Sequence, residues 1–405
     1  MPEPFVLGVN YWPRRKAMAW WHDFDRGEVR DEFDLLAELG LSKVRIFLLW
    51  EDFQPSADRV STRALEHLVT VAGAAADRGL GLDVTFFTGH MSGPNWAPGW
   101  LLDRHAPPPR NGLRVISGDR VVSGGYRNPY VDPLAVKAER LQLQAVVGAL
   151  HDHPGVWMWN LGNEPDLFAV PPSSAAGSDW VATMAATIRE LDPVRPITIG
   201  LHMPSLEADN GLRVDQAFEA CDRSIMHAYP IYSGWSESPT DPDFVPFACA
   251  LTASLSGKPV LAEEFGACTA PAGERTQTLT WEVDGVQRHQ LLLSEEDLAA
   301  HLEEVLPRLV EIGAVGAMPW CFADYAESLW DRPPLDQAIH ERFFGLVRPD
   351  GSLKPHADVL KRFAASALEV REPSPRARID ISGRDYYRDP MRTLVELYRT
   401  FREAG

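Results

Sequence analysis

Eight short segments of the chain are almost continuously apolar, and longer segments with apolar residues at helical spacing lie between them. The apolar segments cover residues 5–12, 42–50, 81–90, 155–164, 195–202, 224–229, 258–266 and 314–320. Strands that are buried on both faces show this pattern, because neither side of such a strand meets water. The sequence therefore predicts eight buried strands.

The segments between these strands carry helix signals. Residues 28–40 have apolar positions at helical spacing. Asp132 followed by Pro133 is typical of an N-cap and a first helical position. Ser294 predicts the start of another helix, in which Pro307 is expected to introduce a kink. A strand followed by a helix is therefore the repeating unit of the chain.

Eight such units are the pattern of an α/β fold, the (β/α)8 TIM barrel. A doubly wound open sheet is the alternative, but it usually begins with a Gly-rich phosphate-binding turn, and GVNYWPRRK at 8–16 is not one. The catalytic barrel is predicted to span residues 1–370. Residues 371–405 are predicted to form an extension that ends in an amphipathic helix and packs on the outside of the barrel.

Three connections are long: residues 91–132, 267–293 and 321–353. All three follow the carboxyl ends of predicted strands, which is the catalytic face of a barrel. The first is rich in Pro, Gly and Trp, which favours an ordered lid over a flexible strap. We therefore expect residues 91–132 to close one end of a cleft.

Composition narrows the range of partners. The chain has 405 residues, a formal net charge of −18 and 13 tryptophans. A surface this acidic repels a phosphate backbone, which argues against a nucleic-acid partner. Tryptophan suits stacking on sugar rings, although it suits core packing equally well.

The cysteines and the N-terminus bear on location. Cys221, Cys249, Cys268 and Cys321 show no C-x-x-C spacing and are too sparse for a disulfide framework. Residues 1–12 lack the basic start and apolar run of a signal peptide. No apolar stretch approaches the ~18 residues of a membrane span. The sequence predicts a cytoplasmic protein with reduced thiols and no membrane partner, and it leaves association into a homo-oligomer open.

Carboxylates stand at the predicted ends of the fourth and seventh strands. These are Glu164 and the pair Glu263 and Glu264. In a barrel both strand ends face the same mouth. Two carboxylates there suit glycoside hydrolysis, in which one acts as general acid and the other as nucleophile or base. A lone rim glutamate is more often half of an ion pair, but two among aromatic and polar strand-end residues favour catalysis.

The residues around these carboxylates resemble glycoside hydrolase family 5, over residues 5–363. The motifs are WNLGNEP at 159–165 and EFG at 264–266. Further strand-end residues of the family match at Arg45, His90, Asn163, His227, Tyr229 and Trp320. The resemblance implies a retaining β-glycosidase of clan A that needs no metal and no other cofactor.

The resemblance makes Glu164 the acid/base and Glu264 the nucleophile. The acid must hold a proton near neutral pH, so its pKa is expected to lie above the usual ~4.3. Burial among Trp157 and Trp159 and a neighbouring anion would raise it. The nucleophile must stay ionised, so Arg45 is expected to donate to Glu264 and hold its pKa down.

The resemblance also gives three neighbouring residues their roles. Tyr229 is expected to donate its hydroxyl to the Glu264 carboxylate. Asn163 is expected to bond the sugar 2-hydroxyl, a contact that strengthens in the transition state. Trp320 is expected to form the floor under the sugar ring.

Strand alternation separates Glu264 from Glu263. Val260, Ala262 and Glu264 share one face, and Leu261 and Glu263 share the other. The small side chain of Ala262 suits a crowded barrel interior, and Leu261 suits the helix layer. The family pattern also places the nucleophile directly before Phe-Gly. We therefore predict that Glu264 is the nucleophile and that Glu263 is a structural rim residue.

Weaker candidates for sugar contacts lie at other strand ends and on the long connections: Tyr11, Trp50, Glu51, Trp96 and Asp324. For Glu51 a salt bridge is the alternative. His202 stays open between lining the site and packing in a loop. A metal-dependent barrel hydrolase would need a motif such as His-x-His on the first strand, which the sequence lacks.

The long loops are expected to narrow an open cleft into a pocket, which favours removal of terminal sugars. With the motif NYWP at 10–13, they resemble the β-mannosidases of the family, which act on manno-oligosaccharides or Man-β-1,4-GlcNAc. The alternatives are an endo-β-mannanase and a β-glucosidase or cellulase-type enzyme of the same clan. A barrel that binds sugar without cleaving it is disfavoured, because Glu164, Glu264 and Arg45 are all present.

Overall fold

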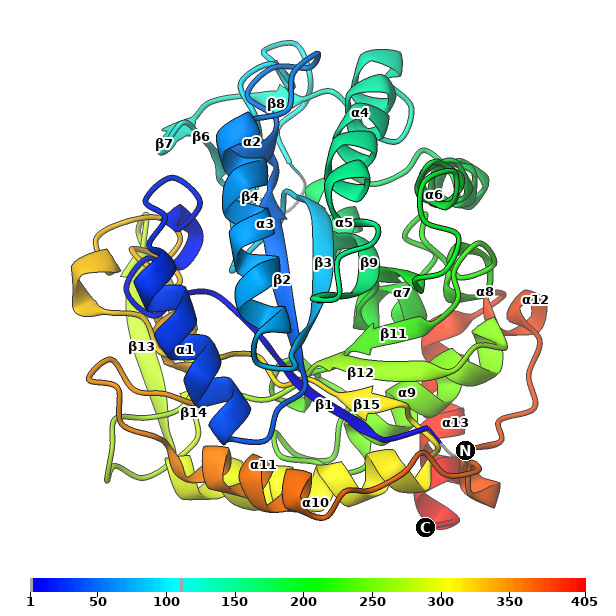
Figure 1. The fold of residues 1–405 in the computed structure, drawn as a ribbon. Coiled ribbons are helices and arrows are strands. Elements are labelled where there is room, and N and C mark those ends of the chain that lie inside the picture. The colour runs from blue at the N-terminus through cyan, green and yellow to red at the C-terminus, as the bar shows by residue number, and fades with distance from the viewer. Residues whose placement is uncertain (1–2, 110–111) are drawn as a thin grey trace.

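The computed structural model of the protein describes residues 3–109 and 112–405. Its centre is a parallel sheet that curls into a barrel with helices around it (Figure 1). The strands are β1 (Val6–Asn10), β2 (Lys43–Leu49), β3 (Gly81–Thr88), β9 (Val156–Asn163), β10 (Ile197–Gly200), β11 (Ser224–His227), β12 (Val260–Glu264) and β15 (Gly316–Ala317). The eight predicted strands and the TIM barrel are confirmed.

The barrel closes between β10 and β11. The strand order β10-β9-β3-β2-β1-β15-β12-β11 puts these two strands at the ends of the sheet. The backbone N–H of His227 donates to the carbonyl of Leu201, and His202 forms a parallel bridge with His227. Closure gathers the carboxyl ends of all the strands around one mouth.

Helices on the outside bury the apolar outer face of the strands. The longer ones are α1 (Arg26–Glu38), α3 (Thr62–Ala76), α4 (Pro133–Leu150), α6 (Ser174–Arg189), α9 (Phe244–Ser256), α10 (Glu295–Glu311) and α11 (Pro355–Ala365). The Asp132 side chain caps α4 by accepting from the N–H groups of Leu134 and Ala135, and Ser294 caps α10. Both predicted N-caps are confirmed.

The long connections contain structure that the sequence pattern did not predict. Residues 91–132 include β4 (Asn95–Trp96), β5 (Leu102–Asp103), β6 (Val115–Ser117), β7 (Arg120–Val122) and β8 (Gly125–Tyr126). Residues 267–293 form a hairpin of β13 (Gln277–Val283) and β14 (Val286–Leu292). The strands β4 to β8 have only two or three residues and are too short to show a period. The strands β13 and β14 are longer but mostly exposed, so they lack the buried apolar run on which the prediction of strands depended.

The C-terminal residues pack beside the strand ends that carry the site. The elements concerned are α7 (Met203–Glu207), α12 (Gly383–Tyr386) and α13 (Pro390–Glu403). The hydroxyl of Tyr386 donates to the carbonyl of Leu206, and the hydroxyl of Tyr387 donates to that of Ser205. These bonds fix α7, which directly follows β10. Among the described residues, no helix has the length and apolar character needed to cross a bilayer.

Candidate active site

A pocket of about 400 Å³ opens at the barrel mouth. Seven residues that the sequence predicted for the site line it: His90, Asn163, Glu164, His227, Tyr229, Glu264 and Trp320. Arg45 is fully buried and bonds to two of these residues from below. The structure therefore brings together the set of residues that carries the family resemblance.

Backbone geometry at the end of β9 positions Glu164. Its φ of 44° and ψ of 53° lie in the left-handed region, which a residue other than glycine rarely adopts. Its N–H donates to the carbonyl of Gly200, and the short helix α5 (Pro165–Phe168) begins at the next residue. The sharp turn aims the carboxylate into the pocket instead of along the strand.

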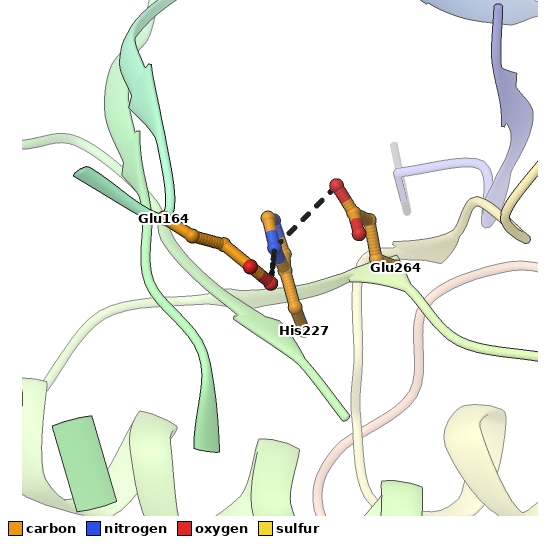
Figure 2. Close-up of side chains that lie close together, drawn as sticks. All are labelled: Glu164, His227 and Glu264. Atoms are coloured by element: carbon orange, nitrogen blue, oxygen red, sulfur yellow. Dashed lines mark hydrogen bonds and ion pairs between the residues drawn. The ribbon is translucent and has the colours of Figure 1, made fainter. Parts of the chain in front are cut away.

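Glu164 and Glu264 face each other across His227 (Figure 2). One atom from each of these three side chains lies within 4.8 Å of the other two. The Nδ1 atom of His227 is 3.0 Å from Glu164 Oε1 and 3.4 Å from Glu264 Oε1. The two carboxylates are therefore close enough to act on opposite sides of one glycosidic bond.

The same three side chains have a spacing that could hold a metal ion. However, Arg45 donates to Glu264 Oε1 at 2.5 Å, and a guanidinium in this position repels a second cation. His227 is also engaged at both nitrogens, which lie 3.0 Å from Glu164 and 3.0 Å from Glu263. This donor set suits proton transfer better than metal coordination.

Two donors hold the Glu264 carboxylate. Arg45 donates through Nη1 to Oε1, and the hydroxyl of Tyr229 donates to Oε2 at 2.9 Å. The guanidinium of Arg45 also donates to Asn163 Oδ1 at 3.0 Å, which fixes that amide beside the pocket. Both donors expected at Glu264 are therefore in place.

Glu263 lies in the barrel interior, and the prediction that it is a rim residue is wrong. Its carboxylate is fully buried and accepts from Asn160 at 3.0 and 3.1 Å. The register between β11 and β12 shifts after Ala262, so that His227 pairs with Glu264 and Glu263 becomes the extra residue of a bulge. A bulge breaks strict alternation, and two consecutive glutamates therefore reach the interior. Only Glu264 lines the pocket.

The pKa of Glu164 is shifted in the opposite direction to the expected one. Burial by itself raises it, but the imidazoles, above all His202 and His227, hold the pKa well below its ordinary value. Trp157 and Trp159, which were expected to bury Glu164, have other partners. Trp159 donates to Asp192, and Trp157 lies under the ammonium of Lys43.

The pKa of Glu264 also departs from the expected direction. Burial raises it above its ordinary value, although His227 and Arg45 act against this shift. Positive charge is therefore gathered nearer to Glu164 than the family roles imply. A proton has to reach Glu164 before it can act as an acid.

Three predicted sugar contacts lie away from the pocket. Tyr11 donates to Glu32 at 2.6 Å, because alternation along β1 turns it toward α1. Trp50 is buried and donates to Gln54 at 2.9 Å. Asp324 forms a buried ion pair with Lys354. These residues are structural, and their predicted contact with substrate does not fit their positions.

Glu51 and Trp96 line a second cavity of about 800 Å³, to which the loops after β1, β2, β3 and β15 all contribute. Glu51 accepts from the N–H of Gly118 at 2.8 Å, so it anchors the turn between β6 and β7. Within residues 3–109 and 112–405, no residue lines both cavities. Neither Glu51 nor Trp96 therefore lines the pocket that contains the two carboxylates.

Sequence reasoning left the role of one pocket residue, His202, open and missed another, Glu341. His202, which it left open, lines the pocket beside Glu164. Glu341, in the 3-10 helix η5 (Ile339–Phe343), adds another carboxyl group, and burial raises its pKa to about 7. Glu341 lies on a long loop without strand or motif, so no signal in the sequence placed it.

Comparison with known proteins finds similarity to glycoside hydrolases that differ in family and in mode of action. Residues 112–366, more than half of the chain, match the family described as glycosyl hydrolases family 2, TIM barrel domain. A probable mannan endo-1,4-β-mannosidase F from Emericella nidulans is 25% identical over 177 residues. That alignment covers 39% of this chain and 37% of the relative, so the chain spans well under two thirds of the relative's length.

Known structures share the fold over nearly the whole chain. The exo-β-1,4-mannosidase Op5Man5 from Opitutaceae bacterium strain TAV5 has a TM-score of 0.73 and 25% identity, and the match covers 93% of this chain and 61% of that one. A variant of GH5_18 from Streptomyces cattleya, in complex with Man-β-1,4-GlcNAc, has a TM-score of 0.78 and 22% identity, with coverages of 98% and 92%. The predicted relationship to barrel glycoside hydrolases is confirmed: the matching family model is that of the family 2 barrel, and the GH5_18 structure shares the fold.

Proposed function

Because the chain belongs to the glycosyl hydrolases that share the family 2 TIM barrel domain, we propose that it is a retaining exo-β-mannosidase acting on short β-mannosides. The observation that carries this proposal is the Glu164–Glu264 pair, whose nearest oxygens lie within 4.8 Å in a pocket that contains Trp320. Retaining glycosidases hold their carboxyl groups about 5–5.5 Å apart, whereas inverting enzymes need ~6.5–9.5 Å to admit a water molecule. The observed spacing supports retention.

In the first step, the Glu264 carboxylate attacks the anomeric carbon from the face opposite the leaving group. Protonated Glu164 gives its proton to the glycosidic oxygen, and the aglycone leaves. Arg45 and Tyr229 hold both oxygens of Glu264, so the attacking group is aligned before substrate arrives. Asn163, fixed by Arg45, is placed to meet the sugar 2-hydroxyl.

In the second step, water replaces the aglycone. Ionised Glu164 takes a proton from the water molecule, the resulting hydroxide attacks the anomeric carbon, and the bond to Glu264 breaks. The sugar leaves with its original β configuration, because the anomeric centre has been inverted twice. Glu164 therefore serves as acid in one step and as base in the next.

The loops after β3 and β15 meet and form a wall across the mouth of the pocket, which supports exo action. Ser92 and Gly93, after β3, line the pocket on the same side as Glu341, after β15. A Cβ atom on Gly93 would lie 3.9 Å from that of Ala338, so the two loops nearly touch. The loops after β3 and β15 also supply lining residues to the second cavity, and none of the described residues lines both cavities.

Polar contacts fasten this wall. Arg114 donates twice to Asp336, at 2.7 and 2.8 Å, which ties the loop after β3 to the loop after β15. Trp281 of β13 donates to the carbonyl of Gln337 at 2.8 Å. These contacts agree with the expected closure of one end of the cleft by residues 91–132, and a pocket closed in this way fits one terminal sugar.

Mannose is proposed as that sugar because the similar proteins include an exo-β-1,4-mannosidase and mannan endo-1,4-β-mannosidases. The test is a panel of aryl β-glycosides (mannoside, glucoside, galactoside and fucoside) assayed with the wild-type chain. The proposal expects the highest kcat/KM on the mannoside. Higher kcat/KM on the glucoside would assign the enzyme to the β-glucosidases, and no release from any of the four would refute the proposal.

An endo-β-mannanase is the second candidate, because the curated relatives are named as endo-acting enzymes. Digestion of mannohexaose separates the two. Exo action releases mannose and mannopentaose first, whereas endo action releases mannobiose, mannotriose and mannotetraose from the start.

The cytoplasm is the proposed location, where short oligosaccharides are trimmed after uptake. All four cysteines are free and buried, as expected for a protein from a reducing compartment. Fractionation of the native cells would test this. Activity recovered in the culture medium would contradict it.

A further inference from the structure

His202 lies between Glu164 and a second carboxylate, Asp166. It follows β10 and is the N-cap residue of α7. Its Nε2 atom is 2.9 and 3.1 Å from the two oxygens of Asp166, and its Nδ1 atom is 3.6 Å from Glu164 Oε2. The imidazole thus has one nitrogen on each carboxylate. Neither His202 nor Asp166 belongs to the residues that carry the family resemblance.

Both partners are nearly shut off from solvent. His202 is 6% exposed and Asp166 is 7% exposed. The charged or titratable groups that face His202 are Glu164, Asp166, Glu264, His90 and His227. Carboxylates outnumber the imidazoles, so the local field favours a protonated ring.

We propose that His202, oriented by Asp166, stores the proton that Glu164 delivers to the leaving group. This deepens the proposed glycosidase function and rests on it. In the free site the proton is on His202 Nδ1 and Glu164 is ionised. When a sugar fills the pocket and displaces water, the proton moves from Nδ1 to Glu164 Oε2, because loss of solvent disfavours the separated charges.

Over one turnover, His202 and Glu164 return to the protonation states from which they started. Glu164 passes the stored proton to the glycosidic oxygen, which leaves a neutral His202 and an ionised Glu164. In the second step Glu164 takes a proton from water, and that proton returns to His202 Nδ1. Throughout the cycle His202 keeps the proton on Nε2, which it donates in a hydrogen bond to Asp166. No species other than substrate and water is needed.

The electrostatics agree with this distribution. Burial lowers the pKa of His202, but Asp166 and Glu164 outweigh it and raise the pKa to about 9. The pKa of Glu164 is held low by the same imidazole. A proton shared by this pair therefore sits on nitrogen at neutral pH.

His227 is less suited to the same task. Its two nitrogens lie 3.0 Å from Glu164 and 3.0 Å from Glu263, so both N–H groups are used in short bonds between buried carboxylates. Loss of either proton would leave a carboxylate facing a lone pair. His202 gives up only a 3.6 Å contact.

The test compares His202→Gln with wild type on two substrates of the same glycone. Mannobiose has a poor leaving group that needs a proton, and 2,4-dinitrophenyl β-mannoside has one that does not. The variant should lose about 10²-fold in kcat/KM on mannobiose at pH 7, in the usual range for general acid catalysis, and almost nothing on the aryl substrate. A purely structural role would lower both to the same extent.

The pH profile gives a second readout. The alkaline limb of kcat/KM on mannobiose should lie near the pKa of His202 in wild type, where the imidazole holds the proton of the pair. In His202→Gln the limb should move to lower pH, because Glu164 then titrates alone: its pKa rises once the imidazolium is gone, but it stays below that of the imidazole. Asp166→Asn keeps the imidazole and should move the limb in the same direction by a smaller amount. An unchanged limb and an unchanged ratio between the two substrates would overturn the proposal.

A matched control is available on the surface. His22 pairs with Asp52 at 2.9 Å, outside the catalytic pocket, so His22→Gln should leave both readouts at their wild-type values. If the wild type hydrolyses neither substrate, the proposed function fails. If it hydrolyses both and His202→Gln behaves as wild type, only the role of His202 fails.

Discussion

The two carboxylates of the pocket share His227 but differ in their other partners. Glu264 accepts from the guanidinium of Arg45 and the phenol of Tyr229, which both keep their protons across the neutral range. Glu164 faces the imidazoles of His227 and His202, which belong to the one side chain whose charge changes near neutral pH.

This difference matches two chemical tasks. A nucleophile has to keep its negative charge until it attacks, so fixed donors suit it. An acid/base has to gain and lose a proton in every turnover, so titratable neighbours suit it. The surroundings thus distinguish Glu264 from Glu164 in the proposed mechanism.

The largest effect is expected from Glu264→Ala, which removes the nucleophile. No glycosyl-enzyme can form, so kcat should fall on the order of 10⁶-fold, as when other covalent nucleophiles are removed. The measurement is release of aryl alcohol from an aryl β-mannoside. Added azide should occupy the vacated place and give the α-mannosyl azide. Substantial activity in Glu264→Ala, together with a dead Glu263→Ala, would move the nucleophile to Glu263.

Glu164→Ala should behave differently, because its defect lies in proton transfer. An activated aryl mannoside barely needs protonation, so the first step should survive and give a burst of aryl alcohol. The intermediate should then accumulate, since no base activates water. Azide needs no base and should restore turnover with the β-mannosyl azide as product. Azides of the opposite anomers from the two variants would reverse the roles assigned to the glutamates.

Arg45→Lys should have a smaller but clear effect. Lysine keeps the charge but loses the planar fork that reaches Glu264, Asn163, Asn10 and Thr85 together. We expect kcat/KM to fall about 10²–10³-fold, the usual cost of one preorganised donor. The bidentate pair between Arg78 and Asp34 on the surface offers a control, because Arg78→Lys should leave kcat/KM unchanged. Equal effects of the two substitutions would show that charge alone matters at Arg45.

The smallest effect is expected at the wall of the pocket. Arg114→Ala breaks a partly exposed ion pair with Asp336, which contributes about 0.2–1 kcal/mol. The melting temperature should therefore fall only slightly. Slow appearance of mannobiose and mannotriose from mannohexaose would indicate that the loops separate more often. Arg78→Ala controls for loss of a surface pair, and identical digests from the two variants would show that this ion pair does not maintain exo action.

The fold could be predicted because its signals are local. Each buried strand shows a continuous apolar run, and α4 begins at an Asp-Pro pair that caps it. Two catalytic candidates could be predicted for the same reason, since Glu164 and Glu264 both follow such runs and barrel topology brings strand ends together. The fixed donors of Glu264 then followed from the family resemblance.

The features of the site that the sequence did not predict depend on contacts between segments, which the pattern of a single segment does not reveal. The bulge in β12 appears only when β11 is laid beside it, so alternation placed Glu263 on the wrong face. Tyr11 and Trp50 had suitable strand-end positions, but their side chains turn into the core. The low pKa of Glu164 comes from imidazoles at the ends of other strands, above all His202 after β10 and His227 in β11, so no pattern around Glu164 itself could have predicted it.

The most direct test of the central claim is the configuration of the first sugar released. Wild-type enzyme is mixed with an aryl β-mannoside, and the anomeric proton of mannose is followed by NMR before mutarotation sets in. With Glu264 as nucleophile and Glu164 as acid/base, β-mannose should appear first and α-mannose only later, as mutarotation proceeds. Appearance of α-mannose first would mean a single displacement by water, and it would contradict the account of the two carboxylates.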